Sequence, residues 1–354
     1  MARIDELFRY LKDNKGSDLH IAAGVVPRIR ASGSLQEIEG WPVLDHAGVE
    51  SLLHEIANDH QWADYQACGD LDFAYSLPGV ARFRCNFLRQ ENGAGAVFRI
   101  IPEKILTCEQ LKMPEAIANL ADLQQGMVLI TGPTGSGKST TLAAVIDRIN
   151  TNYQKHILTI EDPVEFVHPN RGCVFSQREV HHDSHSFADA LKVAVRQDAD
   201  VVLVGEMRDL ETISIAVTAA EMGILVMGTL HTNGAAQTVD RIVNSFPADK
   251  QSHIRTMIST SLRGVISQQL LPTKHKPGRI AALEIMINTP AVANLIRQGK
   301  LDQLETAMQS GGSAGMQTMD NALMDLVDKR WVSGKEAYQQ ANNKSKFAQV
   351  KDQS

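Results

Sequence analysis

A glycine-rich stretch near the middle of the chain has the residue types and spacing of a phosphate-binding loop. It follows the apolar run MVLIT, precedes the helical pattern TTLAAVIDRIN, and reads Gly132-Pro133-Thr134-Gly135-Ser136-Gly137-Lys138-Ser139. This is the complete G-x-x-x-x-G-K-[ST] form, in the strand, loop and helix order that it requires. Glycines let backbone N–H groups approach phosphate oxygens, and the helix start adds the positive end of its dipole.

Three consecutive residues at the start of the following helix complete the expected nucleotide site. Lys138 would reach the β- and γ-phosphates, and the Ser139 hydroxyl would bind Mg²⁺. Together with Thr140, they extend the predicted nucleotide-binding segment over residues 132–140. This motif alone fits a kinase, a switch GTPase or a motor, so other residues must decide among them.

Polar residues follow three further apolar runs, HILTI, VVLV and ILVMGTL, and these are the candidate catalytic residues. They are Glu161, Glu206 and His231. The aspartate that normally supports Mg²⁺ at such a strand end is replaced by Gly205. Glu206 therefore either supports Mg²⁺ through water or orients the attacking water as a general base. His231 would sense the γ-phosphate or position that water.

These side chains need a scaffold that brings several strand ends together. From residue 115 onward, short and fully apolar runs alternate with helical patterns, which is typical of parallel strands covered on both faces. The carboxyl ends of such strands meet at one edge, where ligands bind. The sequence therefore predicts an α/β domain with a mostly parallel sheet over residues 115–341.

The first part of the chain has a different pattern and is expected to form a small α+β domain over residues 1–103. Residues 3–13 have the spacing of an amphipathic helix, and a second helical pattern covers 46–58. In ARFRCNFLR, apolar and polar residues alternate, which places Arg82 and Arg84 on the same strand face. Residues 104–114 are predicted to be a short hinge, and the polar residues 342–354 a solvated tail.

Composition narrows the class of protein further. The chain has 354 residues, with 35 Lys and Arg against 41 Asp and Glu, and hence a net charge of −6. A basic stripe of the kind that coats nucleic acid is not expected from this balance. No apolar run approaches the ~20 residues that span a bilayer, so we expect a cytoplasmic protein.

Taken together, these motifs resemble the secretion and type IV pilus ATPase superfamily, and within it the PilT-type pilus retraction ATPases. The resemblance covers nearly the whole chain, through GSDLHIAAG, ARFRCNF, ITGPTGSGKSTTLAA, ILTIEDPVEF, VVLVGEMRDLETI and GTLHTNGAAQTVDRIVNSFP. The stretch GEMRDLETI favours the retraction branch. Assembly and type II secretion members usually add a long N-terminal domain and a tetracysteine zinc element, neither of which this sequence contains.

The resemblance implies a PAS-like N-terminal domain joined to a RecA-like P-loop ATPase domain. It implies a homohexamer that hydrolyses ATP with Mg²⁺, with arginines of the N-terminal domain contacting phosphate; the candidates are Arg82, Arg84 and Arg99. It also implies a motor for pilus retraction and twitching motility. Such a motor acts on an inner-membrane platform protein and is held at the membrane through that partner.

One segment departs from the family's pattern. The family's A-I-R-N-L-I-R-E motif, implicated in retraction, is AVANLIRQ over residues 291–298 and lacks one arginine and the final acid. An accessory retraction ATPase, or a pilus assembly or type II secretion motor, therefore stays open. A nucleotide-regulated switch or scaffold with weak turnover is the alternative from another class.

Overall fold

The computed structural model describes residues 2–31, 33–101, 104–275 and 278–351, and it divides the chain into two compact units. One unit comprises residues 1–104 with 162–167, and the other comprises 105–161 with 168–354. Residue 103, the predicted end of the first domain, lies outside the described residues, as does the end of the predicted tail at 352–354.

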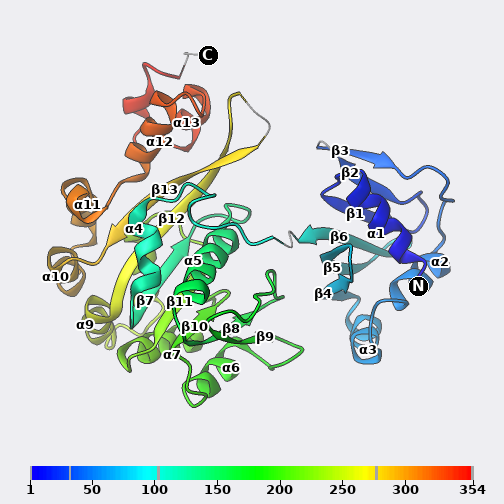
Figure 1. Ribbon diagram of the computed structural model, residues 1–354, viewed down its shortest axis with the longest axis horizontal. Coiled ribbons are helices and arrows are strands. Elements are labelled where there is room, and N and C mark those ends of the chain that lie inside the picture. Colours follow the sequence, from blue (N-terminus) through cyan, green and yellow to red (C-terminus); the bar gives the residue numbers. More distant parts are fainter. Residues whose placement is uncertain (1, 32, 102–103, 276–277, 352–354) are drawn as a thin grey trace. The chain divides into compact units, whose positions relative to one another are not determined.

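The N-terminal unit is built on an antiparallel sheet, which has six strands among the described residues (Figure 1). Their order is β3 (Ser34–Glu37), β2 (Arg28–Ala31), β1 (Asp18–Ala22), β6 (Gly93–Ile101), β5 (Ala81–Gln90) and β4 (Asp70–Leu77). The helices are α1 (Ile4–Asp13), α2 (His46–His54) and α3 (Asp59–Cys68). Their apolar residues and one face of the sheet form a single core.

The alternation predicted for β5 is confirmed. Phe83 and Phe87 are fully buried, and the Phe83 ring stacks on Phe8 of α1 with the ring centroids 4.2 Å apart. Arg82 and Arg84 lie on the opposite face, which the helices leave uncovered. The sheet therefore presents an arginine-bearing face.

The helix predicted over 46–58 is confirmed as α2, which is shorter than expected, and a further helix that the sequence did not predict, α3, follows it. α2 ends at His54, and α3 starts after Asn58, whose side chain accepts a hydrogen bond from the backbone N–H of Gln61 in a capping box. Tyr65 is the buried residue of α3. A helix with so little apolar surface has no periodic pattern to reveal it, which is why the sequence did not predict it.

The second unit is built on a mostly parallel sheet, as predicted. Among the described residues its strands run in the order β13 (Arg279–Ile287), β12 (Leu262–Pro272), β7 (Gly126–Thr131), β11 (Leu225–Leu230), β10 (Val201–Val204), β8 (His156–Glu161) and β9 (Val174–Glu179). Neighbouring strands are parallel except for the β12–β13 hairpin. The strand β7, which leads into the glycine-rich loop, thus lies inside the sheet (Figure 1).

Helices cover both faces of this sheet. Met127 and Leu129 of β7 belong to a core shared with α6 (Phe187–Ala194), α7 (Leu210–Glu221), α8 (Ala235–Asn244) and α9 (Gln251–Ser261). Val128 and Ile130 belong to a second core, shared with α4 (Glu115–Ala118), the 3₁₀ helix η1 (Asn119–Asp122) and α5 (Lys138–Asn152). Burial on both faces explains why these strands read as continuous apolar runs.

The chain ends in a group of short helices after β13. They are α10 (Pro290–Gln298), η2 (Leu301–Gln303), α11 (Leu304–Ser310), η3 (Gly312–Ala314), α12 (Met319–Asp328), α13 (Gly334–Gln340) and η4 (Lys344–Phe347). Within the described ranges, no helix combines the length and the apolarity that crossing a bilayer requires.

The prediction of a solvated tail from residue 342 is wrong over its described part. Phe347 is fully buried in a small core with Leu271 and Leu323. The Asp320 carboxylate accepts hydrogen bonds from the backbone N–H groups of Asn342 and Asn343, at 2.8 and 2.9 Å. One aromatic residue in a polar stretch is enough to fold it back, because burying a phenylalanine side chain contributes about 2–3 kcal/mol.

Candidate active site

The glycine-rich loop connects the end of β7 to the start of α5 in a conformation that only glycine adopts easily. Gly132 and Gly137 have φ angles of 138° and 89°. A Cβ atom at Gly132 would lie 2.2 Å from the carbonyl oxygen of Gln268. The loop therefore passes against the neighbouring strand β12 at a point where no side chain fits.

The lysine of the motif lies over this loop. Lys138 is the first residue of α5, and its Nζ donates hydrogen bonds to the carbonyl oxygens of Gly132 (2.8 Å) and Pro133 (3.1 Å). Ser139 and Thr140 follow in the first turn and are half-buried. The Ser136 hydroxyl is buried and has no hydrogen-bond partner among the described residues. The site thus combines an ammonium group, two adjacent hydroxyl residues and a helix N-terminus.

The predicted catalytic residues lie at the carboxyl ends of three neighbouring strands. Glu161 ends β8, Glu206 comes two residues after β10, and His231 directly follows β11. His231 Nε2 lies 3.0 Å from Glu206 Oε1. A Cβ atom at Gly205 would lie 3.2 Å from the Cα of Glu161, so these two strand ends also approach each other closely. The structure therefore brings the three residues to one edge of the sheet.

Two side chains, Arg208 and His231, contact the Glu206 carboxylate. Its second oxygen pairs with Arg208 at 2.7 Å, a residue that the sequence did not single out for this role. Burial acts to raise the pKa of Glu206, but the hydrogen bonds and charges of Arg208 and His231 outweigh it and keep the pKa below its ordinary value. The carboxylate is therefore ionised near neutral pH and can accept a proton or a hydrogen bond from water.

The three candidate arginines form a cluster of their own on the face of the N-terminal sheet opposite its helices. Arg84 and Arg99 are directly opposite each other on β5 and β6. Arg84 pairs with Asp72 at 2.5 Å, and Arg99 pairs with Asp18 at 2.8 Å. The Nε of Arg82 donates a hydrogen bond of 3.0 Å to the backbone carbonyl oxygen of Val164. The role of the three arginines toward phosphate stays a prediction.

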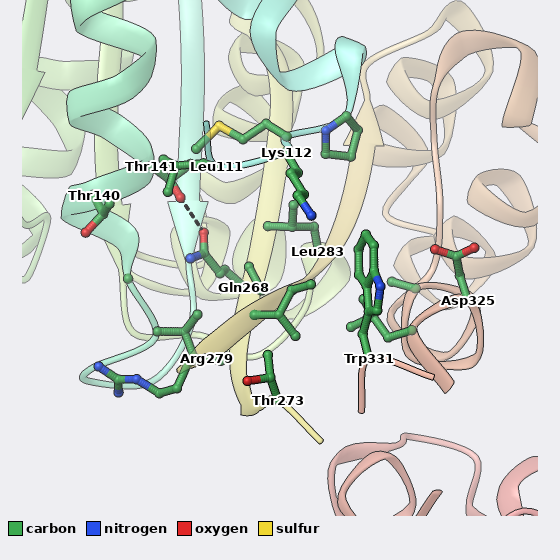
Figure 2. A pocket seen from close by; sticks show the side chains of 18 of the residues that line it. Leu111, Lys112, Thr140, Thr141, Gln268, Thr273, Arg279, Leu283, Asp325 and Trp331 are labelled. Carbon is green, nitrogen blue, oxygen red and sulfur yellow. Dashed lines mark hydrogen bonds between the residues drawn. The ribbon is translucent and has the colours of Figure 1, made fainter. Parts of the chain in front are cut away.

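A cavity of about 760 Å³ adjoins the glycine-rich loop and was not expected from the sequence (Figure 2). It begins at Gly137, Thr140 and Thr141 and extends along β12 and β13 toward the C-terminal helices. Residues far apart in the sequence line it, among them Lys112, Gln268, Arg279, Leu283, Asp325 and Trp331. The cavity therefore lies directly beside the glycine-rich loop and the first turn of α5.

The far wall of this cavity is made by an aromatic ring and two lysines. Lys112 Nζ lies 4.6 Å from the centre of the Trp331 ring, and Lys329 Nζ lies 5.5 Å from it. Figure 2 shows the Lys112 side chain pointing toward this ring. The sequence did not indicate this cavity, because no spacing rule connects these residues to the glycine-rich loop.

A phosphate-binding loop on an inner strand, with an ionised glutamate and a histidine on the neighbouring strand ends, defines a P-loop nucleoside triphosphatase. The chain belongs to the family described as "Type II/IV secretion system protein", whose sequence model matches residues 4–337.

Two relatives and one solved structure are similar over almost the whole chain. The type IV pilus retraction ATPase PilT of Pseudomonas aeruginosa is 51% identical over 97% of this chain and 99% of its own length. A twitching motility protein of Neisseria gonorrhoeae is 50% identical over 90% of this chain and 84% of its own length. A crystal structure of the pilus retraction motor PilT with bound ADP has a TM-score of 0.91 and 38% identity, covering 98% of this chain and 99% of that one.

Proposed function

We propose that this protein is an ATP-hydrolysing motor that powers retraction of type IV pili and thereby twitching motility. The observation that carries this function is the 51% identity to a pilus retraction ATPase over nearly the full length of both chains. Two features of the site support the proposal: Lys138 lies over the glycine-rich loop, and His231 contacts the Glu206 carboxylate.

The nucleotide site that we propose has two parts. The β- and γ-phosphates of ATP bind at residues 132–140, with Lys138 beside them. The nucleoside occupies the adjoining cavity, whose volume of about 760 Å³ is within the usual range for small-molecule sites, roughly 300–1,000 Å³. The related PilT structure contains ADP, which supports a nucleotide in this fold.

The residues around the loop also fit Mg²⁺. This cation takes oxygen ligands and is usually held by few protein groups together with phosphates and water. Ser139 supplies a hydroxyl oxygen at the helix start, and Glu206 supplies an ionised carboxylate after β10, which is separated from β7 by one strand. We assign the direct contact to Ser139. When bound, the cation neutralises charge on the phosphates.

In the proposed hydrolysis, Glu206 orients the attacking water and accepts its proton. His231, 3.0 Å from this carboxylate, fixes its direction, and Arg208 keeps it ionised. Glu161 supports the same strand edge beside Gly205. Arg82, Arg84 and Arg99 contact phosphate and stabilise the charge that develops on it, which planar guanidinium groups do well.

The assembly that we propose is a homohexamer at the cytoplasmic face of the inner membrane. Its partner there is the pilus platform protein, and its attachment to the membrane runs through that protein. The predicted hinge 104–114 belongs almost entirely to the second unit, where Cys108 is buried in the core, so the hinge that we propose is confined to the boundary near residue 104. The relatives named above include a pilus retraction ATPase and a pilus retraction motor, which supports a pilus motor here.

A clean deletion of the gene in the source organism tests this function. We expect abundant surface pili and lost surface motility, because fibres that form would not be withdrawn. Bald cells would instead make the protein an assembly motor. Normal pili and motility would make it an accessory motor and would direct attention to residues 291–298.

A measurement of steady-state phosphate release from ATP by the purified protein distinguishes a motor from a nucleotide-regulated switch or scaffold. A switch would bind the nucleotide with almost no turnover. A motor with the complete site would hydrolyse ATP continuously, and a Lys138→Ala variant would lose that activity.

A further inference from the structure

A buried glutamine on β12 contacts the phosphate-binding loop and the helix that follows it. Gln268 is 2% exposed, and its Nε2 donates a hydrogen bond of 2.6 Å to the carbonyl oxygen of Ser136. Its Oε1 accepts a hydrogen bond of 2.7 Å from the Thr141 hydroxyl, drawn as a dashed line in Figure 2. Its own carbonyl oxygen lies against Gly132, where a Cβ atom would come within 2.2 Å.

The orientation of the Gln268 amide is fixed by chemistry. A backbone carbonyl can only accept a hydrogen bond, so the group that faces Ser136 has to be the amide nitrogen. The Thr141 hydroxyl then donates to the remaining oxygen. Both polar ends of this buried side chain are satisfied, and turning the amide over would place two oxygens face to face at Ser136.

This contact determines the direction of the next peptide N–H group. The carbonyl of Ser136 and the N–H of Gly137 belong to one planar peptide unit, in which they point in opposite directions when the bond is trans. Pinning the carbonyl toward β12 therefore directs the Gly137 N–H away from β12, toward the inside of the loop. N–H groups of this kind are what a phosphate-binding loop uses to hold phosphate.

We propose that Gln268 is a positioning residue, which sets the peptide between Ser136 and Gly137 for phosphate binding. This inference rests on the proposed placement of the phosphates at residues 132–140. Gln268 acts through the backbone of the loop, whereas Lys138 and Ser139 would act on the phosphates themselves.

Replacement of Gln268 by glutamate tests the proposal at constant side-chain size. The ionised carboxylate of this variant cannot donate to the Ser136 carbonyl, so the peptide loses the contact that orients it. We expect the Kd for the fluorescent nucleotide mant-ADP, and the KM for ATP, to rise roughly 10- to 100-fold, as a lost buried hydrogen bond with an unsatisfied partner implies. Thr141→Val removes only the second contact, and we expect a smaller rise of the Kd in the same direction.

Asn150 provides a matched control at the other end of α5. This fully buried amide also donates to a backbone carbonyl, that of Pro169 at 2.7 Å, and accepts from the backbone N–H of Arg171. It lies twelve residues from Lys138, about 18 Å along the helix. Asn150→Asp should lower the melting temperature and leave the mant-ADP Kd within twofold of the parent.

The outcomes decide between positioning and a purely structural role. If Gln268→Glu and Thr141→Val lower the melting temperature as Asn150→Asp does but leave the Kd within twofold, the proposal is overturned. Lys138→Ala tests the underlying site independently. Unchanged mant-ADP binding in that variant would overturn the placement of the phosphates and, with it, the role of Gln268.

Discussion

Replacing Glu206 by glutamine separates its chemical role from its structural one. Glutamine has the same shape, so the strand end and its packing are kept, but it cannot accept a proton from water. The glutamate bonds Arg208 at 2.7 Å and His231 at 3.0 Å. The amide can still accept from one of these two groups, whereas its NH₂ faces the other.

The structure indicates that the loss of stability is small. The Glu206 side chain is 18% exposed, but Arg208 is 66% exposed, so their attraction is screened by water. Such pairs contribute about 0–1 kcal/mol. A general base contributes roughly 100- to 10,000-fold to a rate, which corresponds to about 3–5 kcal/mol of the barrier. The effect on turnover should therefore exceed the effect on folding severalfold.

The assay is steady-state phosphate release at saturating ATP, measured together with mant-ADP affinity and unfolding in urea. We expect kcat to fall at least 100-fold, with nearly unchanged affinity and stability. Glu211→Gln is the control, because Glu211 also pairs with a cation, Lys192, but lies on α7. A kcat for Glu206→Gln within threefold of the parent would refute the assignment of Glu206 as the base.

Two further predictions concern buried titratable groups. Burial, with a smaller contribution from Arg171, lowers the pKa of His168 to about 4. The unfolded chain therefore binds a proton at this histidine at a higher pH than the folded chain does. Stability is lost as the pH falls from about 6.5 to 4. Between pH 7.5 and 4.5, the free energy of unfolding in urea should fall by on the order of 3 kcal/mol through this histidine, and a His168→Leu variant should lack that fall. An unchanged pH dependence in the variant would exclude His168 as its source. Glu284 is 4% exposed and accepts hydrogen bonds from the backbone N–H groups of Ala235 and Met319, at the starts of α8 and α12. Glu284→Ala should lower the free energy of unfolding by about 2–4 kcal/mol through two unsatisfied N–H groups, and a loss below about 0.5 kcal/mol in urea unfolding would contradict this.

The phosphate site could be predicted from the sequence because its parts are contiguous. Residues 132–140 follow one another, and their chemistry depends on local backbone geometry. Glu161, Glu206 and His231 could be grouped as well, because parallel strands bring their carboxyl ends to one edge. No knowledge of the strand order was needed for that step.

Contacts set by strand register could not be predicted in this way. Gln268 meets the loop because β12 pairs with β7 so that Ser267 is opposite Thr131, and nothing in the sequence states this register. The pairing of Arg84 with Asp72 likewise depends on how β4 and β5 align. The burial of Phe347 depends on a core assembled from three distant segments.

The β12–β13 hairpin has a consequence for the entropy of nucleotide binding. Ser267 Oγ accepts a hydrogen bond of 2.9 Å from the N–H of Gly234, in the segment that follows His231. The next residue, Gln268, donates to the Ser136 carbonyl in the glycine-rich loop. Ordering a backbone residue costs about 1–2 kcal/mol. Because residues of β12 bond both segments, their backbone is ordered when the chain folds and not when the nucleotide binds. A nucleotide that enters the site meets loops that are already ordered, so repeated binding and release need not order and disorder them in each cycle.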